Sequence, residues 1–220
     1  MHAPDVAEIC AAVVRAVSAT PCRSRPFPHW LPVDVLPAAA IAGVIALPVA
    51  PPRIADTQGK RETNNATRCY FAGEVLRQAP AAAALAQSFQ SATVVRAIEG
   101  ASGAALHGSL LRIEYCQDTG GFWLEPHRDI SVKLLTLIVY LASPPAGEDW
   151  GTDLYDGNLR PAGRAPAAAG HGLMFRPGSD TWHGFERRPI AGVRRSLIVN
   201  YVTQDWRAVQ ELAFPGRPVG

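Results

Sequence analysis

The sequence predicts an α+β protein that is mainly β, with N-terminal helices packed against a β-sandwich, barrel or jelly roll. Helical periodicity is confined to the first half of the chain. From residue 108 onward, short β-branched segments alternate with Gly, Pro, Asp and Asn, and no helical pattern separates them. This succession of short strands is typical of sandwiches and rolls and differs from alternating βαβ units.

Length and composition indicate one domain that spans residues 1–220. With 48% hydrophobic and 18% charged residues, the chain has enough apolar side chains for one well-buried core. We expect residues 1–107 to form a mostly helical support together with a substrate loop. Residues 108–203 are then expected to form the β core.

Charge, hydropathy and cysteine content exclude several kinds of partner and location. A net charge of +2 without a long basic run gives no sign of nucleic-acid binding. The most apolar stretch, residues 38–47, lies between Pro37 and Pro48 and is too short to span a bilayer. Four scattered cysteines without a CxxC motif, and no secretory signal, indicate a cytoplasmic protein with reduced thiols. The sequence does not define an oligomeric state.

The first half of the chain begins with an amphipathic helix and an extended segment. Residues 5–18 place Val6, Ile9 and Val13 at helical spacing. Residues 20–32 contain several prolines and aromatic side chains, so we expect them to lie extended across the core.

A second helix is expected from Asp34, a suitable N-cap, to about Ala46, with an edge strand continuing over residues 44–49. Residues 52–67 are polar and predict a loop. A short strand over residues 67–72 follows it.

Two short helices are expected between residues 79 and 103, and they end near Gly100 and Gly103. The strands of the second half are then predicted at residues 109–115, 121–127, 133–143, 151–155, 171–177, 181–186 and 194–203. The Pro/Gly/Ala-rich stretch 160–170 is predicted to be a loop between two of them.

A His-x-Asp pair lies within the segment EPHRDISVK. In an extended chain, the side chains of His127 and Asp129 leave the same face of the sheet, whereas Arg128 leaves the other. Two such ligands on one face can chelate one metal ion. The alternative is that they are polar residues that precede an apolar strand.

A third ligand has to come from another strand, and His183 follows Asp129 by 54 positions. In a β-roll, that separation allows a later strand to return beside an earlier one. Two neutral imidazoles and one carboxylate on one side leave three positions of an octahedral ion open. This arrangement suits non-haem Fe(II), which binds a co-substrate and O2 together.

A second two-apart pair occurs in GVRRSLIVNYV, where Arg194 and Ser196 can both face the interior. A guanidinium that points into an apolar pocket is costly unless it meets an anion, and a carboxylate is the natural partner. The alternative is an arginine pair on the surface at the start of a strand.

These segments resemble a known family. The series EYCQDTGGFWLEPHRDIS, LLTLIVYL, DWGTDLY, GLMFRPGSDTWHGF and RRSLIVNY resembles the Fe(II)- and 2-oxoglutarate-dependent dioxygenases, and looks most like their prolyl-hydroxylase-like branch. The resemblance covers residues 108–203. It implies a double-stranded β-helix core of the jelly-roll or cupin type, packed by helices. It also implies Fe(II), 2-oxoglutarate as co-substrate, and O2.

Carried over by position, the resemblance implies that His127, Asp129 and His183 are the iron ligands. Arg194, assisted by Ser196, would bind the far carboxylate of 2-oxoglutarate. Tyr115 matches a family tyrosine that hydrogen-bonds the co-substrate, and its alternative role is that of a core aromatic. Val139 departs from the pattern, because some relatives have a second tyrosine there. Because position 129 is a carboxylate, halogenation is not expected.

The implied reaction is hydroxylation of an unactivated C–H bond in a small molecule (an amino acid, a sugar or a natural-product intermediate), with release of succinate and CO2. The second reading is hydroxylation of a protein or peptide side chain of the prolyl type. The third is a jelly-roll binding module without catalysis.

The substrate-contacting residues are predicted from their positions alone. Arg68 ends the segment GKRETNNATR, residues 59–68, which is either a recognition lid or a solvated loop. Arg128 can meet an anionic substrate where the pocket mouth curls around it. Trp182 lies beside His183 and can form a wall of the pocket or part of the core.

Overall fold

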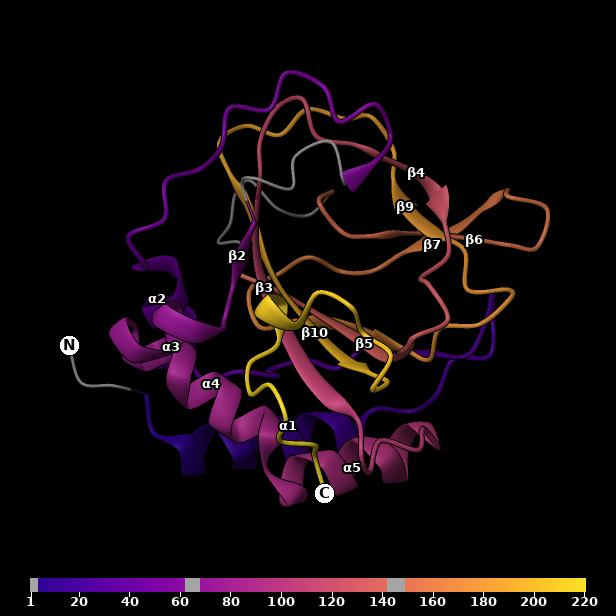
Figure 1. Cartoon of the computed structure of the whole chain (residues 1–220). Coiled ribbons are helices and arrows are strands. Elements are labelled where there is room, and N and C mark those ends of the chain that lie inside the picture. The colour runs from indigo at the N-terminus through magenta and orange to yellow at the C-terminus, as the bar shows by residue number, and fades with distance from the viewer. Residues whose placement is uncertain (1–3, 62–67, 142–148) are drawn as a thin grey trace.

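Two antiparallel sheets face one another, and helices cover the outer face of the larger sheet (Figure 1). The structure is a computed structural model that describes residues 4–61, 68–141 and 149–220. Within these ranges no helix is both long and apolar enough to cross a membrane. All four cysteines lie in the described ranges and carry free thiols.

The larger sheet has six strands in the order β1-β8-β5-β10-β3-β2. Its central strand is β10, which pairs with β3 on one side and with β5 on the other. The strands of this sheet are β1 (His29–Trp30), β2 (Cys69–Tyr70), β3 (Leu110–Asp118), β5 (Lys133–Tyr140), β8 (Gly172–Phe175) and β10 (Arg194–Val202).

The smaller sheet has four strands in the order β4-β9-β6-β7. These are β4 (Leu124–His127), β6 (Asp153–Tyr155), β7 (Pro161–Arg164) and β9 (His183–Phe185). Strand β7 lies in the stretch 160–170 that the sequence predicted as a loop. Its side chains are exposed, so it lacks the apolar pattern by which a strand is recognised.

The helices are α1 (Val6–Ala19), α2 (Ala38–Ile45), α3 (Gly73–Gln78), α4 (Pro80–Gln90) and α5 (Ala92–Ser102), and a 3-10 turn covers Val209–Glu211. α1, α4 and α5 lie together beneath the larger sheet in Figure 1. Their apolar side chains form one core with the outward-facing side chains of the sheet, for example Ile9, Phe89 and Leu137. The predicted mainly β architecture is therefore observed, with helices packed on one of two antiparallel sheets.

Several local predictions were wrong. Asp34 is not a cap: it has a positive φ of 52°, and α2 begins after Pro37 without a side-chain cap. No strand follows α2 over residues 44–49, and helix α3 was not anticipated because, with 6 residues, it is less than two turns long. The end of α5 agrees with the prediction, since Gly103 adopts the left-handed conformation at its C-cap.

Candidate metal and co-substrate site

The two predicted histidine ligands lie side by side on neighbouring strands of the smaller sheet. β4 and β9 pair in antiparallel register with His127 opposite His183, and their ring centroids are 4.4 Å apart. Residues directly opposite in such a pair point to the same face, so both rings project into the space between the sheets. The chain thus brings together two imidazoles that are far apart in sequence.

Hydrogen bonds fix the orientation of both rings. Nδ1 of His127 lies 2.8 Å from the carbonyl oxygen of Glu125, and Nδ1 of His183 lies 2.9 Å from that of Thr181. A carbonyl only accepts, so each Nδ1 carries the proton and each Nε2 keeps its lone pair. In this tautomer Nε2 is the nitrogen that is available to bind a metal.

Burial keeps the imidazoles neutral. It lowers the pKa of His127, and burial together with the neighbouring His127 lowers the pKa of His183 to about 4. Both side chains are therefore available as ligands near pH 7, without competition from protons.

Asp129 lies beside the histidines but is engaged elsewhere. β4 ends at His127, as predicted, so Asp129 follows the strand. Its Oδ1 accepts from Lys133 Nζ at 2.5 Å and its Oδ2 accepts from Thr136 Oγ1 at 2.6 Å. Although burial alone would raise it, the Lys133 ammonium holds the pKa of Asp129 well below its usual range. The group is thus a carboxylate.

As they stand, no three His, Cys, Asp or Glu side chains in the described part of the chain form a group that could hold a metal ion. The two histidines are in place, and all three predicted ligands line one cavity. The Asp129 carboxylate does not complete a metal-binding group with the two histidines, because it points to Lys133 and Thr136.

Arg194 is buried at the other end of the same cavity. Its Nη1 donates to Asp118 Oδ2 at 2.5 Å and its Nε donates to the Trp150 carbonyl at 2.6 Å. The guanidinium also lies 4.6 Å from the ring centroid of Phe185. The remaining terminal nitrogen, Nη2, makes no hydrogen bond with any described residue.

Ser196 lies two positions further along β10 and shares the cavity with Arg194. Ser196 is 1% exposed, and its Oγ has no hydrogen-bond partner among the described residues. A buried hydroxyl without a partner is costly, so this atom is a candidate contact for a ligand. The cavity has a volume of about 300 Å³, which is in the range of small-molecule sites.

The structure does not bring Tyr115 into this cavity. Side chains alternate along β3, and Tyr115 belongs to the face that packs against the helices, in the same core as Ile113 and Leu197. Its alternative role, that of a core aromatic, agrees with this position.

The three predicted substrate residues occupy two places. Arg128 lines the cavity, donates to the Ser179 carbonyl at 3.0 Å and lies 4.6 Å above the Trp182 ring. Trp182 supports Arg128 and lies outside the cavity lining. Arg68 lines the cavity from the opposite wall. The segment before it, residues 62–67 with Asn64 and Asn65, lies outside the described residues.

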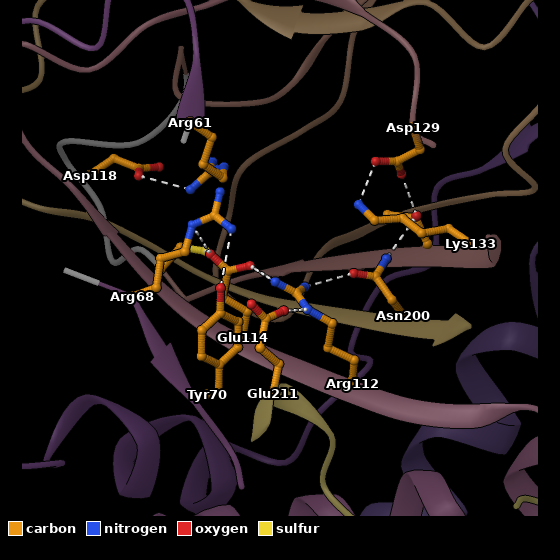
Figure 2. A network of polar contacts seen from close by, with 12 residues as sticks. Arg61, Arg68, Tyr70, Arg112, Glu114, Asp118, Asp129, Lys133, Asn200 and Glu211 are labelled. Carbon is orange, nitrogen blue, oxygen red and sulfur yellow. Dashed lines mark hydrogen bonds and ion pairs between the residues drawn. The ribbon is translucent and has the colours of Figure 1, made fainter. Parts of the chain in front are cut away.

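A buried charged wall on β3 was missed by the sequence reasoning. Figure 2 shows Arg68 and Arg112 on two sides of Glu114, with Arg61 directed to Asp118. Although burial alone would raise it, the guanidinium groups of Arg112, Arg68 and Arg61 lower the pKa of Glu114 to about 2. The signal was present in LLRIEYCQD, because its three charged residues, Arg112, Glu114 and Asp118, all have even numbers and therefore share one face of an extended strand.

Comparison with solved structures supports the fold. No family model and no curated protein matches the sequence. A prolyl-4-hydroxylase from Pseudomonas putida aligns with a TM-score of 0.56 at 16% identity, over 89% of this chain and 94% of that chain. A prolyl hydroxylase from Trichoplax adhaerens, solved with a peptide fragment of hypoxia inducible factor, aligns with a TM-score of 0.60 at 15% identity, over 92% and 93%.

HygX from Streptomyces hygroscopicus, solved with nickel and 2-oxoglutarate bound, aligns with a TM-score of 0.51 at 13% identity, over 81% of this chain and 83% of that chain. The similarity extends over most of each chain, so this protein has the fold of prolyl hydroxylases and of HygX. At these identities the likeness concerns the fold alone.

Proposed function

We propose that the protein is a non-haem Fe(II)- and 2-oxoglutarate-dependent oxygenase that hydroxylates a C–H bond of a small molecule. The observation that carries this proposal is the pair of opposed imidazoles, His127 and His183, each with Nδ1 fixed by a carbonyl and Nε2 available at the cavity wall. Asp129 lines the same cavity. The shared fold with HygX, which was solved with nickel and 2-oxoglutarate, agrees with it.

The donor set fits Fe(II). His127, His183 and Asp129 supply the two nitrogens and one carboxylate typical of non-haem Fe(II) sites. Coordination requires the Asp129 carboxylate to turn from Lys133 toward the histidines. Lys133 and Thr136 hold that carboxylate ionised and close by, so the turn is a change of side-chain torsions rather than of the fold.

The opposite end of the cavity fits the far carboxylate of 2-oxoglutarate. Arg194 offers Nη2, and Ser196 offers a buried hydroxyl without a partner. Phe185 lies against the guanidinium, so water is excluded from one side of this contact. A charged hydrogen bond made in such surroundings is stronger than one in water.

Fe(II) with 2-oxoglutarate and O2 supplies the oxidising power for C–H hydroxylation, with release of succinate and CO2. The chain's own residues have other tasks. His127, Asp129 and His183 hold the metal, and Arg194 and Ser196 orient the co-substrate. The apolar side chains between the sheets limit the access of water.

Hydroxylation of a peptide side chain is the second candidate. One structural neighbour is a prolyl hydroxylase solved in complex with a peptide fragment. The volume of the cavity, about 300 Å³, and its charged wall favour a small polar molecule.

Metal binding tests the proposal without requiring the substrate. We expect Ni(II) and 2-oxoglutarate to bind the wild-type protein in calorimetric titrations, and His183→Ala to weaken metal binding by at least about 100-fold. His107→Ala removes an exposed histidine outside the cavity and is the matched control. Succinate release that depends on Fe(II) and 2-oxoglutarate distinguishes an enzyme from a binding module. Full metal affinity in His183→Ala would refute the proposed ligand set.

A further inference from the structure

Four arginines of the cavity wall, Arg61, Arg68, Arg112 and Arg194, pair with three carboxylates, Glu114, Asp118 and Glu211, so the wall has one positive charge in excess. Glu114 accepts from Arg112 Nη2 at 2.9 Å, and its contact with Arg68 Nε is longer, at 3.4 Å. Arg68 helps to keep Glu114 ionised, but its Nε makes no hydrogen bond to this carboxylate, to which Arg112 already donates. Arg68 is therefore the less tightly held of the two cations at Glu114.

The same relation holds for Asp118. Arg194 Nη1 lies 2.5 Å from Asp118 Oδ2, whereas Arg61 Nη1 lies 3.4 Å from Oδ1. Each acid on the cavity face of β3 thus has one close arginine and one more distant arginine. Arg61 and Arg68, the two distant ones, both line the cavity and both precede β2 in the sequence.

The surroundings of both side chains leave donors available. Their side chains are only 20% and 14% exposed, for Arg61 and Arg68 respectively. Arg61 lies 4.8 Å from the ring centroid of Phe122, and Arg68 Nη1 donates to the Tyr70 hydroxyl at 3.2 Å. The buried Nε of Arg68 makes no hydrogen bond within the described part of the chain. Partly buried guanidinium groups with incomplete hydrogen bonding call for an anion.

Arg194 is the cation proposed above for 2-oxoglutarate, and the remaining cations of the cavity are already paired or held. Arg112 donates to Glu211, Glu114 and Asn200, at 2.7, 2.9 and 3.1 Å. Lys133 donates to Asp129. Arg128 is exposed and is held by Ser179 and Trp182.

We propose that Arg61 and Arg68 together bind a carboxylate of the substrate, so that the substrate is a small carboxylic acid rather than a neutral molecule or a prolyl side chain. This inference rests on the proposed function and names the substrate class of that site. A planar carboxylate matches the guanidinium fork, and two adjacent cations favour one anion between them. A peptidyl proline ring carries no charge and would leave both guanidinium groups without a partner.

Matched pairs of acids and primary amides test the proposal. The probes are free amino acids with their carboxamides, and benzoate with benzamide, titrated by calorimetry into Ni(II)-loaded protein under saturating 2-oxoglutarate without O2. In the wild-type protein we expect acids to bind more tightly than their amides by roughly ten- to a hundredfold, for at least one pair. In Arg61→Gln/Arg68→Gln this preference falls below about threefold, and the affinity for 2-oxoglutarate is retained.

Two further variants keep the result interpretable. Arg187→Gln removes one positive charge from an exposed arginine that pairs with Asp56, so it is expected to keep the preference for acids. Arg61→Lys/Arg68→Lys keeps both charges and is expected to retain part of the preference for acids. It also serves as the test if Arg61→Gln/Arg68→Gln does not fold.

Three outcomes would overturn the inference. In the first, the wild-type protein binds amides as tightly as it binds acids. In the second, Arg61→Gln/Arg68→Gln keeps the wild-type preference for acids over amides. The third is loss of 2-oxoglutarate binding in that variant, which would assign the two arginines to the co-substrate. The titrations are repeated without metal and 2-oxoglutarate. The wild-type protein could fail to bind metal and 2-oxoglutarate and still prefer acids to amides. That result would contradict the proposed function but not the proposed carboxylate site.

Discussion

The two faces of the larger sheet come from the same strands and have opposite chemistry. On β10, the side chains that face the helices are apolar or aromatic: Leu197, Val199 and Tyr201. Those that face the cavity are mainly polar: Arg194, Ser196, Ile198 and Asn200. β3 repeats the pattern, with Leu111 and Ile113 toward the helices and Arg112 and Glu114 toward the cavity.

This contrast separates stability from function within single strands. Burial of apolar side chains against the helices stabilises the fold. Buried ion pairs contribute little net stability, because the cost of desolvating both charges offsets their attraction. The charged face is therefore best explained by the ligands that it receives, and it can be tested apart from the apolar face.

The largest effect is expected when one charge is removed from the cavity face. Glu114→Gln leaves Arg112 and Arg68 facing a neutral amide, and we expect it to lower the free energy of unfolding by about 4 kcal/mol at pH 7, measured by urea denaturation. Because Arg68 is the second cation at this carboxylate, Arg68→Gln in the same chain should restore part of the loss. An additive double variant would contradict this picture of the cavity wall.

Acid titration sharpens the same prediction. The pKa of Glu114 is lowered from 4.5 to about 2 in the folded protein, so its contribution to stability is present above about pH 4.5. That contribution is lost as the pH falls from about 4.5 toward 2, because the unfolded chain then binds the proton more tightly. Glu114→Gln should show a weaker loss of stability than the wild-type protein in this window.

The next effect concerns the face toward the helices. Leu137 on β5 is fully buried in the core shared with the helices, and Leu137→Ala should cost about 3 kcal/mol through lost burial and the cavity it leaves. Calorimetry should find Ni(II) and 2-oxoglutarate affinities within about twofold of wild type, since this side chain points away from the site. A large loss of ligand affinity would show that the two faces are not separable.

The smallest effect on stability is expected at Ser196. Ser196→Ala removes a buried hydroxyl without a hydrogen-bond partner, so the free energy of unfolding should stay constant or rise by less than about 1 kcal/mol. The affinity for 2-oxoglutarate should fall by roughly five- to tenfold, because a donor to its carboxylate is lost. Ser196→Thr keeps the hydroxyl and is the control, whose affinity should lie closer to wild type. Unchanged co-substrate binding in Ser196→Ala would remove Ser196 from the site.

Much of this arrangement could be predicted from the sequence, because it depends on short-range alternation. The spacing of Arg194 and Ser196 predicted that both face the interior, and they do. The separation of His127 and His183 allowed them to meet in a β-roll and the resemblance implied it, but no local pattern records that β9 returns beside β4. Assigning these residues to iron and 2-oxoglutarate remains a prediction.

The rest depends on contacts that a linear pattern does not contain. The same alternation, applied to β3, places Tyr115 on the other face of the strand from Arg112 and Glu114. Its assignment to the cavity therefore conflicted with the alternation in its own strand. The orientation of Asp129 is set by Lys133 and Thr136, which β5 brings to it. The order of distances from Glu114 to its two arginines is equally a matter of tertiary packing.

The edge position of β2 has an evolutionary consequence. The groups proposed to hold metal and co-substrate lie on or beside β4, β9 and the central strand β10, whereas Arg61 and Arg68 precede a two-residue strand at the margin of the sheet. If the proposed function holds, replacement of this peripheral segment would alter which molecules are accepted and leave the proposed oxidative chemistry in place. Libraries that diversify positions 61 and 68 are thus a direct route to redesigned selectivity in this scaffold.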